Sequence, residues 1–299
     1  MTRHFLTLAD FTSAELRELI ARAIVLKGEQ RAGIRYEPLK NRTLGMIFDK
    51  SSTRTRISFE VAMTQFGGNA IFLSPGAMQL GRGEPIEDTA RVMSSMVDAV
   101  VIRTGGHEMI ETFARHARAP VINGLTDLHH PCQLLADIQT WVEHRGDIAG
   151  RKAAWLGDGN NVCHSWMQAA RLFGFTLHIA CPPAYRPDPG LIEENAAHVV
   201  LGADPRAAVA GADVVVTDTW ASMGQEQEKE ERMRAFAGYQ VDAAMMARAG
   251  SGALFMHCLP AYRGYEVSAG VLDGPQSVIW DEAENRLHAQ KALLEFLLR

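Results

Sequence analysis

Two successive series of short apolar runs, separated by helix-like stretches, most constrain the fold of this 299-residue chain. The runs lack the polar/apolar alternation of strands that have one face in water. Strands that are apolar on both faces and separated by helices are typical of parallel sheets covered on both sides. The first series is 43–48, 69–73, 98–103 and 120–125, and the second is 153–158, 177–182, 198–203, 213–220, 253–259 and 277–280.

The spacing of apolar residues predicts helices in the segments between these runs. Residues 12–15 form a capping box that opens the first helix, because a hydroxyl and a carboxylate at this spacing satisfy end amides reciprocally. The last helix carries Leu287, Lys291, Leu294 and Leu298 on one face. Further helices are expected at about 54–66, 86–96, 107–117 and 132–144.

The predicted fold class is α/β, with two doubly wound parallel-sheet domains and the active site in the cleft between them. Domains commonly contain about 150 residues, so the length of this chain agrees with two domains. We expect the first domain at residues 1–147 and the second at 148–283. The C-terminal helix, at about 284–299, is expected to pack back on the first domain.

Charge and cysteine content exclude several classes of protein. The chain has 30 basic and 35 acidic residues and no strongly basic half, so nothing favours a nucleic acid or an acidic membrane as partner. No apolar stretch reaches the ~18 residues of a membrane span, and the N-terminus does not resemble a signal peptide. The four cysteines form no CxxC pair, which indicates no metal site and is typical of reduced thiols in a cytoplasm.

A charged stretch, QEQEKEERMR, occupies residues 225–234. Runs of this kind usually form a solvated helix face. We therefore expect most of this stretch to be exposed.

The sharpest local motif is Ser52-Thr53-Arg54-Thr55-Arg56, which lies between a predicted strand and the next helix. Ligands of open α/β sheets bind beyond the carboxyl ends of the strands, and a helix N-terminus offers unpaired N–H groups and a positive dipole end. Two hydroxyls and a guanidinium added there would make a phosphate cradle. An ordinary Ser/Thr cap with surface arginines would give the same local sequence, so the motif alone leaves both interpretations open.

A second motif, His130-Pro131-Cys132-Gln133, again lies between a strand and a helix. Its imidazole and amide could donate hydrogen bonds to a polarised carbonyl, and Arg103 at the end of strand 98–103 could reach the same crevice. By itself, His130 is more easily explained as a structural histidine. The functional interpretation gains force because all of these segments follow strands of one predicted domain.

The second domain has strand-end residues of its own. Asn161 ends a GDGNN stretch, Asp218 ends a strand before Ser222-Met223-Gly224, and a later strand ends at His257-Cys258-Leu259-Pro260. A carboxylate, an amide and a hydroxyl together suit the ammonium and carboxylate ends of an amino acid. The structural alternatives are a helix cap for Asp218, core packing for Met223 and an inert buried thiol for Cys258.

Taken together, these motifs resemble those of the ornithine carbamoyltransferases, within the wider aspartate/ornithine carbamoyltransferase family. The resemblance covers essentially the whole chain in the expected order. It rests on STRTR (52–56), HPCQ (130–133), Asp218 with SMG (222–224), HCLP (257–260) and DEAENR (281–286).

The resemblance implies a role for each matching residue. Arg54, Arg103, His130 and Cys258 would be catalytic. Carbamoyl phosphate would be bound by Ser52, Thr53, Arg54, Thr55, Gln79, Arg103, His130, Pro131, Cys132, Gln133, Cys258, Leu259 and Arg286. Ornithine would be bound by Asn161, Asp218, Ser222 and Met223. The family also implies a homo-oligomer, a trimer or a multiple of trimers, in which the loop carrying Gln79 reaches a neighbouring subunit's site. Some relatives have a lysine where Gly83 stands, and Arg82 is the nearby cation here.

The implied reaction transfers the carbamoyl group of carbamoyl phosphate to the δ-amine of ornithine, which gives citrulline and phosphate. It needs no metal or organic cofactor, because carbamoyl phosphate is already activated. Three alternatives stay open: another acceptor such as an acylated ornithine or a diamine, a dinucleotide-dependent oxidoreductase that uses GDGNN, and a catalytically silent binding protein. The glycine pattern disfavours the oxidoreductase, because GDGNN lacks the third glycine of a dinucleotide fingerprint.

Overall fold

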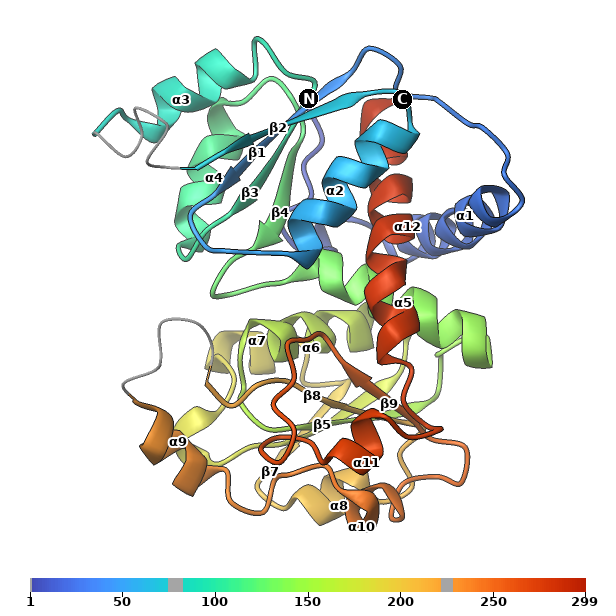
Figure 1. Cartoon of the computed structure of the whole chain (residues 1–299). Coiled ribbons are helices and arrows are strands. Elements are labelled where there is room, and N and C mark those ends of the chain that lie inside the picture. The colour runs from blue at the N-terminus through green and yellow to red at the C-terminus, as the bar shows by residue number, and fades with distance from the viewer. Residues whose placement is uncertain (1, 75–82, 222–227) are drawn as a thin grey trace. The chain divides into compact units, whose positions relative to one another are not determined.

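The computed structural model describes residues 2–74, 83–221 and 228–299. The chain forms two compact units (Figure 1). Unit 1 comprises Met1–Gln139 and Glu284–Arg299, and unit 2 comprises Thr140–Ala283. Two long helices, α5 (Pro131–Arg145) and α12 (Ile279–Leu298), therefore each contribute residues to both units. The predicted boundary near residue 147 differs slightly from this division. The assignment of one substrate to each domain stays a prediction.

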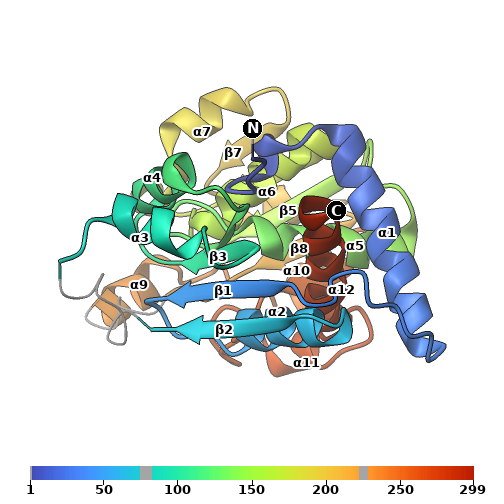
Figure 2. The ribbon, with the colours of Figure 1, turned by 90° about the horizontal axis from the view of Figure 1, so that it is seen from above.

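Unit 1 contains a parallel sheet whose strand order is β2-β1-β3-β4. The strands are β1 (Thr43–Phe48), β2 (Asn69–Leu73), β3 (Ala99–Arg103) and β4 (Val121–Leu125), and β1 and β2 are seen side by side in Figure 2. The central strands β1 and β3 are apolar and buried along nearly their whole length. This burial on both faces explains why their sequences show no alternation.

Helices cover both faces of this sheet. On one face, α3 (Ile86–Met93) and α4 (His107–His116) share a core with the strands that includes Ile47, Ile102 and Phe113. On the other side lie α1 (Ser13–Arg31), α2 (Arg54–Gln65) and α12 (Figure 1). Buried polar contacts join these helices: Lys27 of α1 donates to Asn285 of α12 over 2.7 Å.

Unit 2 contains a five-stranded parallel sheet of order β7-β6-β5-β8-β9. The strands are β5 (Lys152–Leu156), β6 (Thr176–Ala180), β7 (Val199–Gly202), β8 (Val214–Thr217) and β9 (Leu254–His257). The helices are α6 (Asn161–Phe173), α7 (Pro189–Glu194), α8 (Pro205–Val209), α9 (Lys229–Ala235), α10 (Ala243–Met246) and α11 (Ala269–Leu272). Apolar residues of α8, α10 and α11 pack with Leu156, Val215 and Phe255 in one core.

Most predicted elements are present, and the predicted α/β class with parallel sheets is confirmed. The capping box is confirmed, since Thr12 accepts from the Glu15 amide and Glu15 accepts from the Thr12 amide. The predicted strand at 277–280 is wrong, because α12 begins at Ile279 and only Ser277 forms an isolated bridge to Phe255. Acidic residues in the first turn of α12 favour a helix start there.

The charged stretch is mostly exposed where the structure describes it, as expected, and Arg232 is its buried exception there. Its guanidinium has an aromatic and carboxylate environment within the unit, which offsets the cost of burying the charge. Among the described residues, none of the helices combines the length and the apolarity needed to cross a bilayer.

Candidate functional site

The strand order of unit 1 reverses between β1 and β3. β1 lies between β2 and β3, so the chain leaves β1 toward one side of the sheet and β3 toward the other. Such a reversal point is where open α/β sheets bind ligands. Phe48, the last residue of β1, pairs with Arg103, the last residue of β3. The segments 52–56 and 103–105 therefore leave the sheet as neighbours.

The N-terminus of α2 is shaped by the predicted cradle residues. Ser52 accepts a hydrogen bond from the Thr55 amide over 3.2 Å, and Thr53 occupies the cap position without a side-chain cap bond. Arg54 begins the helix, and Thr55 is almost fully buried. These side chains surround the positive end of a helix dipole, which is where a phosphate is stabilised.

Arg286 joins two of these segments within unit 1. Its guanidinium, on α12, donates to the Thr55 hydroxyl over 2.9 Å and to the Gln133 side-chain oxygen over 2.5 Å. Gln133 in turn donates to Asp137 over 2.8 Å, one turn further along α5. A planar guanidinium with two fixed acceptors has a defined orientation, so this chain of contacts pre-organises the α2 and α5 termini.

His130 precedes α5 and is buried, with 5% of its surface exposed. Burial, and then the guanidiniums of Arg286, Arg103 and Arg54, hold the pKa of His130 well below its usual 6.5. The imidazole is therefore neutral at pH 7 and can donate one hydrogen bond without carrying charge. The charges of three cations thus act on one neutral donor, which is an environment for an anion with a polarised carbonyl.

Pro131 and Cys132, the other two residues of the motif 130–133, contribute to the local structure. Pro131 is the first residue of α5, where a residue without an N–H group is tolerated. The Cys132 thiol is fully buried and donates to the Asn123 carbonyl over 3.3 Å. Burial raises the pKa of Cys132 to about 12, so its thiol is inert and only its backbone is available to a ligand.

Unit 2 has the same kind of reversal point between β5 and β8. Asn160, just after β5, donates from its amide to the Asp218 carboxylate over 2.8 Å, and its oxygen caps the Val162 and Cys163 amides. Asn161 is the first residue of α6. The sequence interpretation named Asn161 and missed Asn160, although an asparagine before an apolar helical run is a recognisable N-cap.

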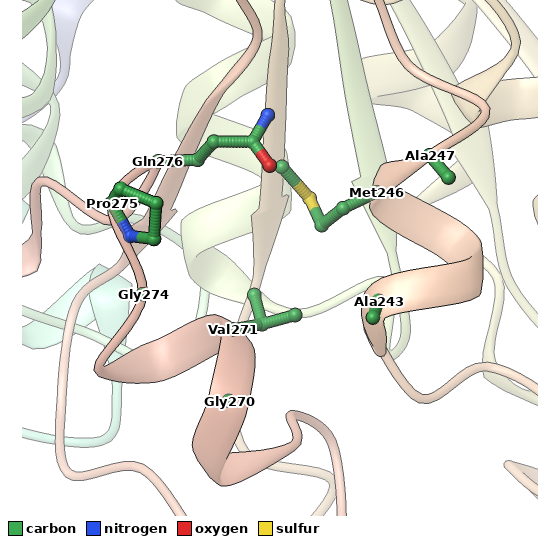
Figure 3. A pocket seen from close by; sticks show the side chains of 8 residues that line it. All are labelled: Ala243, Met246, Ala247, Gly270, Val271, Gly274, Pro275 and Gln276. Atoms are coloured by element: carbon green, nitrogen blue, oxygen red, sulfur yellow. The ribbon is translucent and has the colours of Figure 1, made fainter.

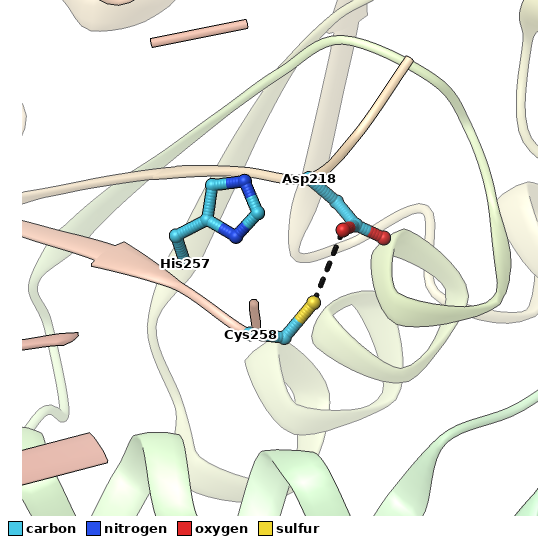
Figure 4. Close-up of side chains that lie close together, drawn as sticks. All are labelled: Asp218, His257 and Cys258. Carbon is cyan, nitrogen blue, oxygen red and sulfur yellow. Dashed lines mark hydrogen bonds between the residues drawn. The ribbon is translucent and has the colours of Figure 1, made fainter. Parts of the chain in front are cut away.

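Cys258 lies beside Asp218 (Figure 4), and its thiol donates to the carboxylate over 3.1 Å. The same carboxylate oxygen accepts from the Thr219 amide over 2.7 Å. Leu259 follows with a left-handed φ of 58°. Its amide donates to His257 Nδ1 over 2.9 Å, which holds this uncommon conformation. The predicted neighbours Asp218 and Cys258 are thus brought together within the unit.

Asp218, His257 and Cys258 also offer ligand atoms within 4.8 Å of one another, a spacing that a metal could use. Both ring nitrogens of His257 already have partners: Nδ1 accepts from Leu259, and Nε2 lies 3.1 Å from Glu266. A metal would have to displace one of these contacts. The donor set is therefore better explained as a hydrogen-bonded group than as a metal site.

The glycine-rich stretch after β5 is closed to a dinucleotide. A side chain at Gly159 would collide with the backbone of Arg186 and Pro187, so that segment already packs on the loop. The α6 amides that would receive a pyrophosphate are capped by Asn160. These contacts argue against the oxidoreductase alternative.

The predicted site residues Gln79, Ser222 and Met223 lie outside the described residues, as do Arg82, Gly224 and residues 225–227 of the charged stretch. A hollow of about 200 Å³ in unit 2 (Figure 3) contains none of the predicted site residues. It is lined by Met246, Val271 and Gln276 among others, and Gln276 donates to the Ala253 carbonyl just before β9. This hollow therefore lies near the amino end of a strand, away from the reversal point.

Two doubly wound parallel sheets, each with polar residues gathered at its reversal point, define a two-unit α/β protein with a candidate anion site. Two family models match this chain. The carbamoyl-P binding domain of aspartate/ornithine carbamoyltransferase matches residues 3–143, and the Asp/Orn binding domain matches residues 149–297. The chain belongs to the aspartate/ornithine carbamoyltransferase family.

Individual relatives agree with this family. An ornithine carbamoyltransferase from Methylococcus capsulatus is 66% identical over 296 residues, which cover 99% of this chain and 98% of the relative. The crystal structure of ornithine carbamoyltransferase from Burkholderia thailandensis is 52% identical, covers 99% of this chain and 98% of its own, and has a TM-score of 0.93. The solved ornithine carbamoyltransferase from Pyrococcus furiosus is 49% identical, with coverage of 98% and 96% and a TM-score of 0.94.

Proposed function

We propose that this chain is an ornithine carbamoyltransferase, which converts carbamoyl phosphate and L-ornithine into L-citrulline and phosphate. The observation that carries the proposal is the gathering of Arg54, Arg103 and Arg286 at the strand ends of unit 1, where Arg286 donates to Thr55 and Gln133 and burial helps to keep His130 neutral. A phosphate next to a carbonyl suits this combination of cations and one uncharged donor. Membership of the carbamoyltransferase family supports the same interpretation.

On the donor side, the α2 terminus would receive the phosphate of carbamoyl phosphate. Ser52, Thr53, Arg54 and Thr55 would bind it, while Arg103, His130 and Gln133 would hold the carbonyl and amide end. A correctly placed oxyanion donor is worth about 3 kcal/mol in the transition state. Because carbamoyl phosphate is an activated acyl donor, the residues need only orient it and stabilise the developing charge.

On the acceptor side, Asn161, Asp218, Ser222 and Met223 would bind ornithine, and Cys258 and Leu259 would adjoin the carbamoyl group. The δ-amine must be neutral to attack, although the pKa of a free lysine-like amine is about 10.4. Asp218 and Cys258 would orient it. The nitrogen bonds to the carbonyl carbon, the carbon–oxygen bond to phosphate breaks, and the departing phosphate can take the proton.

A citrulline assay tests the proposed acceptor directly. Ornithine, putrescine and N-acetylornithine are added together at equal concentration, and the carbamoylated products are separated and quantified. We expect citrulline to dominate, because Asp218 and Asn161 together suit a free amino acid: N-acetylornithine lacks the free α-ammonium group, and putrescine lacks the α-carboxylate. Carbamoylputrescine or acetylcitrulline as the main product would show that putrescine or N-acetylornithine, and not ornithine, is the preferred acceptor. The absence of any product would favour a silent binding protein.

The cellular setting is proposed on the family's chemistry alone. Citrulline formation would serve arginine biosynthesis in the cytoplasm. The assembly would be a homotrimer or a multiple of trimers, in which Gln79 completes a neighbour's carbamoyl phosphate site.

Subunit mixing tests the shared site. A Gln79→Ala, Arg82→Ala double mutant is combined with Arg54→Ala, and each is inactive or nearly so by itself. In mixed trimers, some sites would receive an intact cradle from one chain and an intact loop from another. We expect about one site in four to be active at a one-to-one random mixture, because one chain must supply the cradle and the other the loop.

The mixed assemblies are verified by two different affinity tags, and mixing of either mutant with itself is the control. Activity that stays at the level of the unmixed mutants, in assemblies that carry both tags, would show that each chain completes its own site.

A further inference from the structure

Arg232 is buried, unlike most of the charged stretch 225–234 that the structure describes. Its side chain in α9 is 4% exposed, whereas its neighbours Glu230 and Glu231 face solvent. The guanidinium lies over the ring of Tyr185, 4.6 Å from the centroid, and 5.7 Å from that of Phe236. Phe236 is itself stacked on Trp220. An arginine held among aromatic rings has a fixed orientation, so its donors point in defined directions.

Besides Glu228, the residue just before its own helix, Arg232 has two acceptors, which follow different strands. One is the carboxylate of Asp158, which follows β5, and the other is the carbonyl of Trp220, which follows β8. β5 and β8 are the neighbouring strands at the reversal point of the unit 2 sheet. One side chain therefore ties together both segments that leave this point.

The residues between these attachment points are those of the proposed acceptor site. Asn160 lies two residues after Asp158, and Asp218 lies two residues before Trp220. Asn160 donates to the Asp218 carboxylate over 2.8 Å. If the two segments separated, this bond would lengthen and the carboxylate would lose its orientation.

We infer that Arg232 is a positioning residue that clamps the segments after β5 and β8, so that Asn160 holds the Asp218 carboxylate in the orientation that receives the amino-acid acceptor. The inference deepens the proposed function and rests on it, because it concerns the same acceptor site. Arg232 acts through Asp158 and Trp220 and touches no substrate. Its loss should therefore affect acceptor binding and leave the phosphate cradle of unit 1 intact.

The test measures binding of L-norvaline, which is ornithine without its δ-amino group. Norvaline cannot be carbamoylated at that position, so its dissociation constant can be measured by calorimetry with saturating carbamoyl phosphate. Arg232→Met removes the donors and keeps an apolar stem. We expect it to raise the Kd for norvaline at least about tenfold, while the Kd for carbamoyl phosphate changes less than about twofold.

Arg232→Lys is the conservative comparison, and it also serves if the methionine variant does not fold. Lysine keeps the charge near Asp158 but cannot reach two acceptors with a planar fork. We expect a norvaline Kd between those of the wild type and the methionine variant. Arg171→Met is the matched control, because Arg171 makes a comparable tie to Asn195 and Glu194 elsewhere in unit 2. It should leave norvaline binding unchanged.

The pH dependence of norvaline binding distinguishes a positioning role of Arg232 from a role in fold stability alone. Burial raises the pKa of Asp158 to about 6, against the lowering effect of Arg232, and Asp218 and Glu228 raise it further. The charge of Asp158 also acts on the Cys163 and Cys181 thiols. Since protonation removes the charge that Arg232 holds, norvaline affinity of the wild type should fall as the pH drops through about 6. Norvaline itself keeps its charges between roughly pH 5 and 7.

In Arg232→Met, norvaline affinity should be weak and nearly independent of pH over this range, because the clamp is already absent. Wild-type affinity in the methionine variant, or an equal loss of carbamoyl phosphate and norvaline binding, would overturn the inference. So would a wild-type protein that does not bind norvaline. Wild-type protein that binds norvaline but forms no citrulline would overturn the proposed function alone.

Discussion

Arg54→Ala is expected to lower the rate of carbamoyl transfer by about a hundred- to a thousandfold while the fold stays intact. Arg54 begins α2 at the carboxyl edge of the unit 1 sheet, next to the hydroxyls of Ser52 and Thr53. Its charge is one of three that act on His130. Removing one pre-organised donor that stabilises transition-state charge typically costs about 3–4 kcal/mol. The measurement is kcat and kcat/KM for citrulline formation at saturating ornithine.

Arg56→Ala is the matched control for this variant. Arg56 lies two residues further along the same helix, pairs with Glu60 over 2.8 Å and covers the ring of Phe72. It is expected to keep activity within about threefold, because half-exposed ion pairs contribute little. An Arg54→Ala variant that retains more than about a tenth of wild-type turnover would remove Arg54 from the catalytic set.

Asp218→Asn is expected to weaken ornithine binding by about 1.5–3 kcal/mol, or roughly ten- to a hundredfold, with carbamoyl phosphate binding preserved. The substituted side chain would keep one acceptor oxygen for the Thr219 amide and the Cys258 thiol. Its new amide group would face the Asn160 amide, where two donors cannot bond to each other. The charge that would attract an ammonium group is also lost. Calorimetry with each ligand separates an effect on the acceptor from an effect on the donor.

Asp213→Asn controls for the removal of a carboxylate at the same strand. Asp213 precedes β8 at its amino end, where it accepts from the Lys152 amide over 2.9 Å. Ornithine affinity should be unchanged in this variant. Equal losses of affinity for ornithine and carbamoyl phosphate in Asp218→Asn would contradict the assignment of the acceptor to unit 2.

Local signals were sufficient to predict where the segment 52–56 lies in the fold. The segment 52–56 stands between an apolar strand and a helix start, and both signals lie within a few residues of the motif. The parallel arrangement of the strands then determines that 52–56 and Arg103 leave the sheet side by side. The position of each motif could therefore be predicted from the sequence, although its role came from resemblance to a family.

The electrostatic state of the site could not be predicted in this way. His130 is neutral because it is buried and because guanidiniums from α2, β3 and α12 act on it together. These residues are far apart in the sequence. The burial of Arg232 could not be predicted for the same reason, since its partner Asp158 is 74 residues away and a local run of charge indicates exposure. The error at 277–280 is different: a short apolar run fits a strand or a buried helix start equally well.

Transfer of the carbamoyl carbon to the δ-nitrogen is the central claim, and isotope labelling tests it most directly. Carbamoyl phosphate labelled with carbon-13 is incubated with ornithine labelled with nitrogen-15 at the δ-position, and the product is observed by NMR. We predict a ureido carbon signal that is split by one-bond coupling to the labelled nitrogen, formed by the wild type and nearly absent with Arg54→Ala. A carbon-13 signal that appears only in carbamate or bicarbonate, or a ureido carbon without that coupling, would contradict the account.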